Sequence, residues 1–153
     1  MSLPLVIIIE NDPRRRQILS LLVKAVTLVD VIDFANSSEA HPIIRAQQPA
    51  LVICSWHDGG AGMIADRIAE TPPSAPDLLL LTREINAAQI EMCRRAGNAQ
   101  LIPSAPLNLN ALRNRVLLQL EGPDTLARRL SLSGAFLSSA VESLPALRRR
   151  LAL

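Results

Sequence analysis

The sequence predicts an α/β fold: a doubly wound, parallel sheet of five strands with helices on both faces, followed by a helical extension. Two observations support this. Short apolar runs alternate five times with longer stretches of helical periodicity, and hydrophobic residues make up 49% of the 153 residues, which is enough to fill a core. Strands that alternate with helices imply right-handed crossovers, and therefore a parallel sheet that is covered on both sides.

The apolar runs are the predicted strands. The first, Leu5 to Ile9, is unbroken, as expected for a strand buried on both faces. Asp30 and Asp33 interrupt the second run, so we expect that strand near an edge of the sheet. The predicted strands cover residues 5–9, 29–34, 51–55, 78–81 and 101–102.

The first helix has a clear start. Asp12 is a suitable N-cap, and Pro13 suits the first helical turn, where its missing N–H is not needed. Ile18, Leu22 and Ala25 recur at helical spacing, so we expect them to form the face of this helix that packs on the sheet.

The later helices are also marked by their ends. In the second, over about 38–47, Pro42 limits how early the helix becomes regular. A third is predicted over about 63–70, and a fourth, over about 86–96, ends at Gly97. Asn108 is a plausible N-cap for the fifth. Its predicted inward residues are Leu109, Leu112, Val116 and Leu120. Five strand–helix units in about 120 residues match the size of a flavodoxin-like domain, which we place at residues 4–121.

Gly122 and Pro123 mark the boundary of a second segment, residues 122–153. This segment contains an amphipathic helix, and Pro145 should kink or restart it. Its apolar stripe consists of Phe136, Ala140, Leu144, Leu147 and Leu151. Such a stripe needs a partner surface, so the extension is interpreted as a dimerisation element, a linker or the start of a further domain. It is also distantly similar to the opening helix of histidine phosphotransfer domains.

Composition and charge narrow the class of partner. The formal net charge is +2, which without a clustered basic patch argues against nucleic acid. The unbroken apolar runs, such as residues 5–9 and 78–81, are far too short to span a bilayer. Cys54 and Cys93 lie within apolar or helical patterns and do not suggest a disulfide framework, so we expect a cytoplasmic protein.

Polar side chains stand where the predicted strands end. Glu10 and Asn11 follow the first strand, Ser55 ends the third, Thr82 follows the fourth and Ser104 follows the fifth. The carboxyl ends of parallel strands meet at one edge of a sheet, which is where ligands bind in doubly wound folds. We therefore expect these five residues to converge.

Over about residues 4–120 the chain resembles the receiver (CheY-like) domain of bacterial response regulators. Receivers carry paired acids after the first strand, a phospho-accepting aspartate after the third, a serine or threonine after the fourth, and a lysine followed by proline after the fifth. The spacing of these points fits this sequence up to Gly97. The pair Ala96-Gly97 and the segment from Pro106 to Leu112 also resemble the family.

The departures from the family concern its phosphorylation site. Glu10 keeps one acid of the pair, but Asn11 occupies the other metal-binding position, and Ser55 stands in place of the phospho-accepting aspartate. Thr82 is preserved in type, while Ser104, or Ala105 if the proline sets the alignment, replaces the lysine. The resemblance thus implies a degenerate phosphorylation pocket.

The chemistry explains why such a pocket is silent. Phosphoryl transfer at this site needs a carboxylate nucleophile, a divalent ion and a cation near the phosphoryl oxygens. The hydroxyl of Ser55 is a poor nucleophile, and the sequence shows no positioned base beside it. Glu10, Asn11 and Ser55 together carry one formal negative charge, whereas Mg²⁺ prefers several anionic oxygens. We expect no catalytic residue, no cofactor and weak or absent Mg²⁺ binding.

The sequence therefore predicts a pseudo-receiver of a two-component-type signalling protein, not an enzyme. It would act through a protein partner or self-association, on a surface such as the fourth helix, fifth strand and fifth helix. Histidine kinases and phosphotransfer proteins are the candidate partners. One alternative is an atypical receiver that accepts phosphate at Asp58 or Ser55. Another is a small-molecule binder at the strand-end crevice, which the lack of a glycine-rich loop after the first strand disfavours.

Other residues have two interpretations each. Asp58 lies in a glycine-rich loop and is read first as a solvated turn residue. His41 and His57 are interpreted as surface histidines and not as a metal pair. Trp56 either anchors a partner or packs over the pocket. Residues 14–16, three arginines at a helix start, either form a solvated face or meet an acidic partner.

Overall fold

The computed structural model describes residues 3–56 and 76–122 of the chain. The chain divides between Leu120 and Glu121 into two units, and nearly all of the second unit lies outside the described ranges. The helix predicted over about 63–70, the loop residues His57 and Asp58, and the amphipathic helix of the extension lie outside them as well. The domain boundary near residue 121 therefore stays a prediction.

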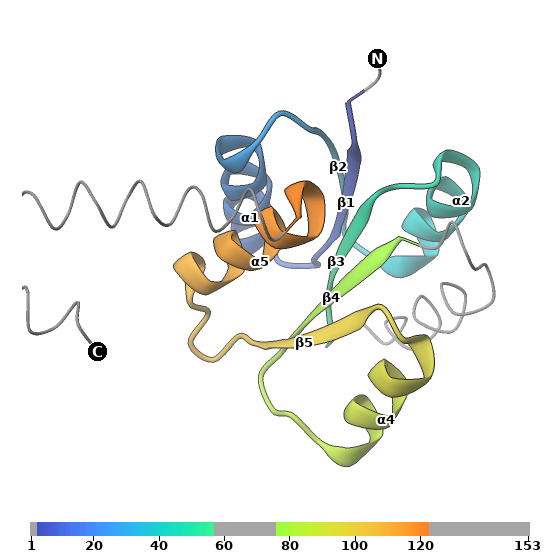
Figure 1. The fold of residues 1–153 in the computed structure, drawn as a ribbon, viewed down its shortest axis with the longest axis vertical. Coiled ribbons are helices and arrows are strands. Elements are labelled where there is room, and N and C mark those ends of the chain that lie inside the picture. Colours follow the sequence, from blue (N-terminus) through green and yellow to red (C-terminus); the bar gives the residue numbers. More distant parts are fainter. Residues whose placement is uncertain (1–2, 57–75, 123–153) are drawn as a thin grey trace, which may run out of the picture. The chain divides into compact units, whose positions relative to one another are not determined.

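The described domain is built on a parallel sheet in the order β2-β1-β3-β4-β5, the order of flavodoxin-like folds (Figure 1). This confirms the predicted fold class. The strands are β1 (Leu5–Ile9), β2 (Asp30–Phe34), β3 (Leu51–Ser55), β4 (Asp77–Thr82) and β5 (Ala99–Pro103).

Burial differs between the central and the edge strands. In β1, β3 and β4 nearly every residue is buried, as the unbroken apolar runs predict. The second strand lies at an edge, as Asp30 and Asp33 indicate, and both of these residues are exposed. The other edge strand, β5, is longer than predicted, because an edge strand tolerates polar residues such as Gln100, which pairs with Leu79 of β4.

Helices cover both faces of the sheet. Figure 1 shows α1 and α5 on one side and α2 and α4 on the other. Their bounds are α1 (Pro13–Val26), α2 (Ser37–Gln47), α4 (Ala87–Ala96) and α5 (Leu109–Glu121). Gly97 ends α4 as predicted, with φ of 78° and its N–H donated to the Cys93 carbonyl at 3.0 Å.

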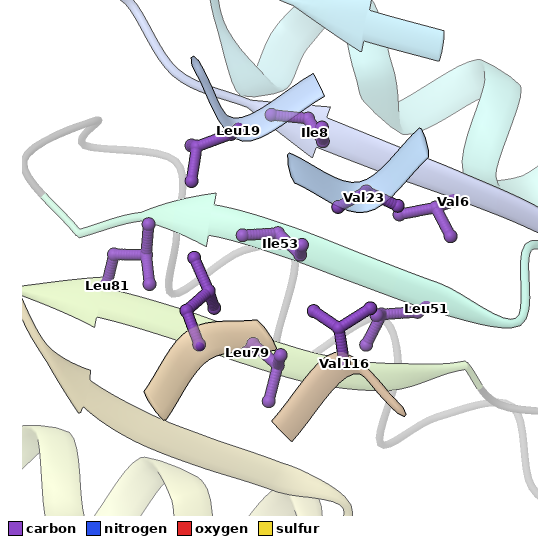
Figure 2. Packing of buried hydrophobic residues seen from close by; sticks show 10 residues of the cluster. Val6, Ile8, Leu19, Val23, Leu51, Ile53, Leu79, Leu81 and Val116 are labelled. Atoms are coloured by element: carbon purple, nitrogen blue, oxygen red, sulfur yellow. The ribbon is translucent and has the colours of Figure 1, made fainter. Parts of the chain in front are cut away.

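Alternate residues of the strands point into two separate apolar cores, as the pleat requires. On the α1 and α5 side, Leu19 and Val23 of α1 and Val116 of α5 meet the strand residues (Figure 2). Those strand residues are Val6, Ile8, Leu51, Ile53, Leu79 and Leu81. On the other side, Ala40 and Ile44 of α2 and Met92 of α4 close the second core. Both cores consist of aliphatic residues, with sulfur from Cys54 and Met92 in the second.

The predicted inner face of α1 is offset by one residue. Leu19, Val23 and Val26 are buried, whereas Ile18 is 47% exposed and Ala25 is exposed. Of the predicted residues, only Leu22 packs against the core. Both sets have the same i, i+4, i+7 spacing, so periodicity alone could not choose between them. Tertiary contacts determine which set faces inward, because they place Leu19 and Val23 against the core of the sheet.

Two smaller predictions about helices also need correction. On α5, Leu112 and Val116 are buried and Leu120 packs against the core, as predicted. Leu117 is buried as well, whereas Leu109 is 45% exposed at the first turn. In α2 the helix is regular from Ser37 onward despite Pro42. The Asn36 side chain caps the helix start by accepting the Glu39 N–H at 3.0 Å, so the first turn is fixed ahead of Pro42.

Candidate functional site

The polar residues at the strand ends form a row along one edge of the sheet. The strand order places Glu10, Ser55, Thr82 and Ser104 at the ends of four adjacent strands, β1, β3, β4 and β5. All four are buried, with 0%, 1%, 2% and 8% of their surface exposed. Asn11 is exposed. The structure thus brings the predicted residues to one edge, with Asn11 on its solvent side.

The carboxylate of Glu10 and the hydroxyl of Ser55 are in direct contact. Ser55 Oγ donates a hydrogen bond to Glu10 Oε2, between residues that are 45 apart in the sequence. The parallel register that pairs Ile9 with Cys54 places the following residues side by side. The expectation that Ser55 has no base beside it is therefore wrong, because strand pairing and not sequence proximity supplies the acceptor.

Further groups hold the Glu10 carboxylate. Its Oε1 accepts the backbone N–H of Asp12 at 3.1 Å. Arg15 Nε lies 3.9 Å from Oε2, so a guanidinium faces the buried negative charge. The backbone carbonyl of Glu10 also accepts a hydrogen bond from Arg16 Nη1 at 2.9 Å. Residue 10 is thus tied to the first turn of α1 through both its side chain and its backbone.

The arginine run at the start of α1 is not uniformly solvated. The side chains of Arg15 and Arg16 are only 24% and 23% exposed, and Arg16 Nε lies 3.9 Å from Asp33 Oδ1 at the end of β2. Arg14, in contrast, is exposed. Because α1 begins directly after β1, its first turn stands beside the strand ends. The acidic groups that Arg15 and Arg16 meet therefore belong to the same domain.

Thr82 belongs to a second, uncharged network. Its Oγ1 donates to the Glu84 carbonyl at 2.7 Å and accepts from Gln89 Nε2 at 3.0 Å. Gln89 is 2% exposed and forms a capping box with Asn86 at the start of α4. Gln89 is not among the residues predicted from the sequence, although the Asn-x-x-Gln pattern at the predicted helix start is a signal for it.

Ser104 completes the row without supplying a charge. Its backbone N–H donates to the Thr82 carbonyl at 2.8 Å. Within residues 3–56 and 76–122, its buried Oγ has no hydrogen-bond partner. Neither Ser104 nor the neighbouring Ala105 carries a positive charge, so the position at which receivers have lysine is neutral in this chain.

The donor set at this edge is a poor fit to Mg²⁺. Mg²⁺ prefers an octahedron of hard oxygens that includes carboxylates. Glu10 is the carboxylate in the row, and its two oxygens are already engaged by Ser55, Asp12 and Arg15. Asn11 and Ser55 would add neutral oxygens. In the part of the chain that the structure describes, no three His, Cys, Asp or Glu residues gather as a metal site.

The remaining residues singled out by the sequence are distributed around the domain. Trp56 is half-buried and packs against the core on the α2 and α4 side. His41 is half-buried within α2. Both cysteines are free thiols, Cys54 buried and Cys93 half-buried, and burial raises the pKa of the Cys93 thiol. Within residues 3–56 and 76–122, no helix is both long and apolar enough to cross a membrane.

The described domain has the receiver fold of two-component signalling proteins. One similar structure is the signal receiver domain of a DNA-binding response regulator from Colwellia psychrerythraea 34H. It has a TM-score of 0.67 and 19% sequence identity, and the match covers 77% of this chain and 98% of that chain. A signal receiver domain of a histidine kinase from Clostridium thermocellum matches with a TM-score of 0.65 and 15% identity, over 76% and 97% of the two chains.

A third similar structure is described as an atypical orphan response regulator with a phosphorylation-independent regulatory mechanism. Its TM-score is 0.64 at 15% identity, and the match covers 76% of this chain and 95% of that chain. No family model matches the sequence. No curated protein matches it either. At these identities, the likeness to solved structures establishes the fold alone.

Proposed function

We propose that this chain is a pseudo-receiver, a cytoplasmic module of a two-component-type signalling protein that acts by binding another protein without aspartyl phosphorylation. It is not an enzyme and uses no metal or cofactor. One observation carries the proposal: the residue at the end of β3 is Ser55, and its hydroxyl is buried against Glu10.

The chemistry of the row supports this proposal. An aspartyl phosphate requires a carboxylate at the end of β3, and serine has none. The metal that would neutralise the incoming phosphoryl group needs more negative charge than Glu10 alone supplies. Ser104 leaves the row without the cation that would face the phosphoryl oxygens. Each of these substitutions removes a different requirement of the reaction.

A similar structure supports the mode of action. The atypical orphan response regulator is said to work by a phosphorylation-independent mechanism. A protein with this fold can therefore regulate without being phosphorylated, and we propose the same mode of action for this chain.

The exposed apolar side chains support a protein partner. Ile85 precedes α4, Ile90 lies on α4 and Leu109 begins α5, with 50%, 55% and 45% exposure. These residues belong to or adjoin α4 and α5, two elements of the surface where we expect the contact. Leu21 of α1 and Leu28 are more exposed, at 60% and 80%, so exposure alone does not select this surface. A histidine kinase, a phosphotransfer protein or a second copy of the chain are the candidate partners.

A second candidate function has one specific observation in its favour. The Glu10 carboxylate accepts the hydrogen bond of Ser55, which is the arrangement a base needs to draw a proton from a serine nucleophile. Ser55 could then accept phosphate in place of an aspartate. Its 1% exposure weighs against this role, because a phosphodonor must reach the oxygen. Asp58 is the other acceptor considered for an atypical receiver.

Incubation with acetyl phosphate and Mg²⁺, followed by intact-mass spectrometry, tests the proposal. We expect no added phosphoryl group and no thermal stabilisation by beryllofluoride with Mg²⁺. A receiver with the complete acidic site, treated in parallel, is the positive control. A phosphoryl adduct on this chain would overturn the proposal. Its loss in Ser55→Ala or in Asp58→Asn would then identify the acceptor.

A further inference from the structure

We propose that the guanidinium of Arg15 supplies, from within the chain, the positive charge that a bound divalent cation would supply beside the Glu10 carboxylate. Arg15 thereby excludes Mg²⁺ from the row of strand-end residues. This inference rests on the proposed function and deepens it, because it names a side chain that keeps the site silent beyond the missing carboxylates.

The contact that carries the inference is the one between Arg15 and Glu10. The carboxylate is 0% exposed, and Arg15 Nε lies 3.9 Å from its Oε2. A buried carboxylate is very unfavourable unless it is both hydrogen-bonded and paired with a charge. Ser55 and the Asp12 N–H supply the hydrogen bonds. Arg15 supplies a full positive charge on the same oxygen that Ser55 contacts.

The position of Arg15 in its helix supports a dedicated role. It lies in the first turn of α1, which contains no acidic residue, and a cation there opposes the helix dipole. The Asp12 side chain caps that turn by accepting the N–H groups of Arg14 and Arg15, at 2.9 and 3.5 Å. This cap fixes the turn beside the end of β1. The unfavourable placement of Arg15 is offset by its pairing with Glu10.

A divalent cation and the guanidinium would compete for the same carboxylate. A metal bound through Glu10 would lie close to the Arg15 charge, and the repulsion would be little screened next to a buried group. Restoring the missing carboxylates is therefore insufficient for metal binding while Arg15 is present. Removing Arg15 should be required as well.

Arg14 offers a matched control. It is the same residue type one position away, but its side chain is exposed. Changing either residue to glutamine removes one charge from the same helical turn and preserves helix propensity. Arg15→Lys keeps the charge and should continue to exclude the metal, so this variant separates charge from loss of packing.

The test is made in the full chain carrying Asn11→Asp and Ser55→Asp. Mg²⁺ titration by calorimetry, with the thermal shift as a second readout, compares added Arg15→Gln, Arg15→Lys and Arg14→Gln. We expect Arg15→Gln to tighten Mg²⁺ binding at least about tenfold. Arg14→Gln and Arg15→Lys should change it by less than about threefold. If the double variant does not fold, the Asn11→Asp background supports the same comparison.

Equal Mg²⁺ affinity in the Arg15→Gln and Arg14→Gln variants would overturn the inference. That outcome is distinct from failure of the proposed function, which would show as a phosphoryl adduct on the unaltered chain. A chain that takes no phosphate and shows no difference between the two arginines would refute the role of Arg15 alone.

Discussion

Two corners of the same sheet edge differ in charge. At the ends of β1 and β3, Glu10 and Ser55 meet in a buried contact, and the guanidinium of Arg15 lies 3.9 Å from the carboxylate. At the end of β4, Thr82 and Gln89 form an uncharged network that reaches the cap of α4. We call these the charged corner and the neutral corner.

The comparison separates the polar side chains at the edge of the sheet from the apolar core that supports the strands. The charged corner contains Asn11 and Ser55, the two positions on which the proposed loss of phosphoryl transfer rests. The neutral corner keeps a hydroxyl on β4 that is joined by a hydrogen bond to a helix. The apolar core supports the strands beneath both corners, and the polar side chains at the edge are not part of it.

We expect the largest loss of stability when the Glu10 carboxylate of the charged corner is removed. Glu10→Ala should destabilise the domain by about 3 kcal/mol, because it leaves the Ser55 hydroxyl without its acceptor and Arg15 without its partner. Asp33→Ala, which removes an exposed carboxylate near Arg16, should cost less than about 1 kcal/mol. Urea unfolding followed by circular dichroism measures both. If the two variants lost a similar amount of stability, burial of the Glu10 carboxylate would not be the cause of its contribution.

A matched pair of serines tests the hydroxyl of the same corner. Ser55→Ala should cost about 2 kcal/mol, because the buried Glu10 carboxylate loses a donor. Ser104→Ala should be nearly neutral, since no hydrogen-bond partner contacts its buried oxygen among the described residues. Both changes remove one oxygen from a buried site. Equal free energies of unfolding would contradict the assignment of the Ser55 contact.

The neutral corner should respond more weakly and more locally. Thr82→Val removes the acceptor of Gln89 and should cost about 1 kcal/mol. Hydrogen exchange at the start of α4 should accelerate about fivefold, and the amides of α2 serve as the internal reference. An effect spread evenly over both helices would mean that Thr82 stabilises the sheet and does not hold α4.

The smallest effect on stability is expected at Asp77, which begins β4 at the end opposite to Thr82. Burial raises the pKa of Asp77 above its usual value of 3.8, so the folded state keeps this proton to a higher pH than the unfolded chain does. Stability from this group is therefore present at low pH and is lost as the pH rises through the raised pKa. Asp77→Asn should stabilise the domain at neutral pH by up to about 0.5 kcal/mol.

That gain should vanish as the pH falls below the usual pKa of the carboxyl group. Urea titrations of the wild type and the variant at a neutral and an acidic pH provide the comparison. A gain that is independent of pH would exclude desolvation of the Asp77 carboxylate as the cause.

Much of the framework could be predicted from local patterns. The unbroken run at Leu5 to Ile9 predicted a central strand, and the aspartates at 30 and 33 predicted an edge. Gly97 marked the end of α4. These signals succeed because they depend on a residue and its near neighbours. The inner face of α1 could not be predicted, because two sets of residues share the same helical spacing.

The amino-acid sequence alone determined the alternation of strands and helices, and the fact that position 55 carries a hydroxyl and no carboxylate. Only the tertiary structure decided that this hydroxyl lies against Glu10, that Arg15 faces the same oxygen, and that Gln89 reaches Thr82. Local hydrogen bonding and hydrophobic periodicity act over a few residues. Contacts between strand ends depend on strand order and register, which the packing of the whole sheet sets.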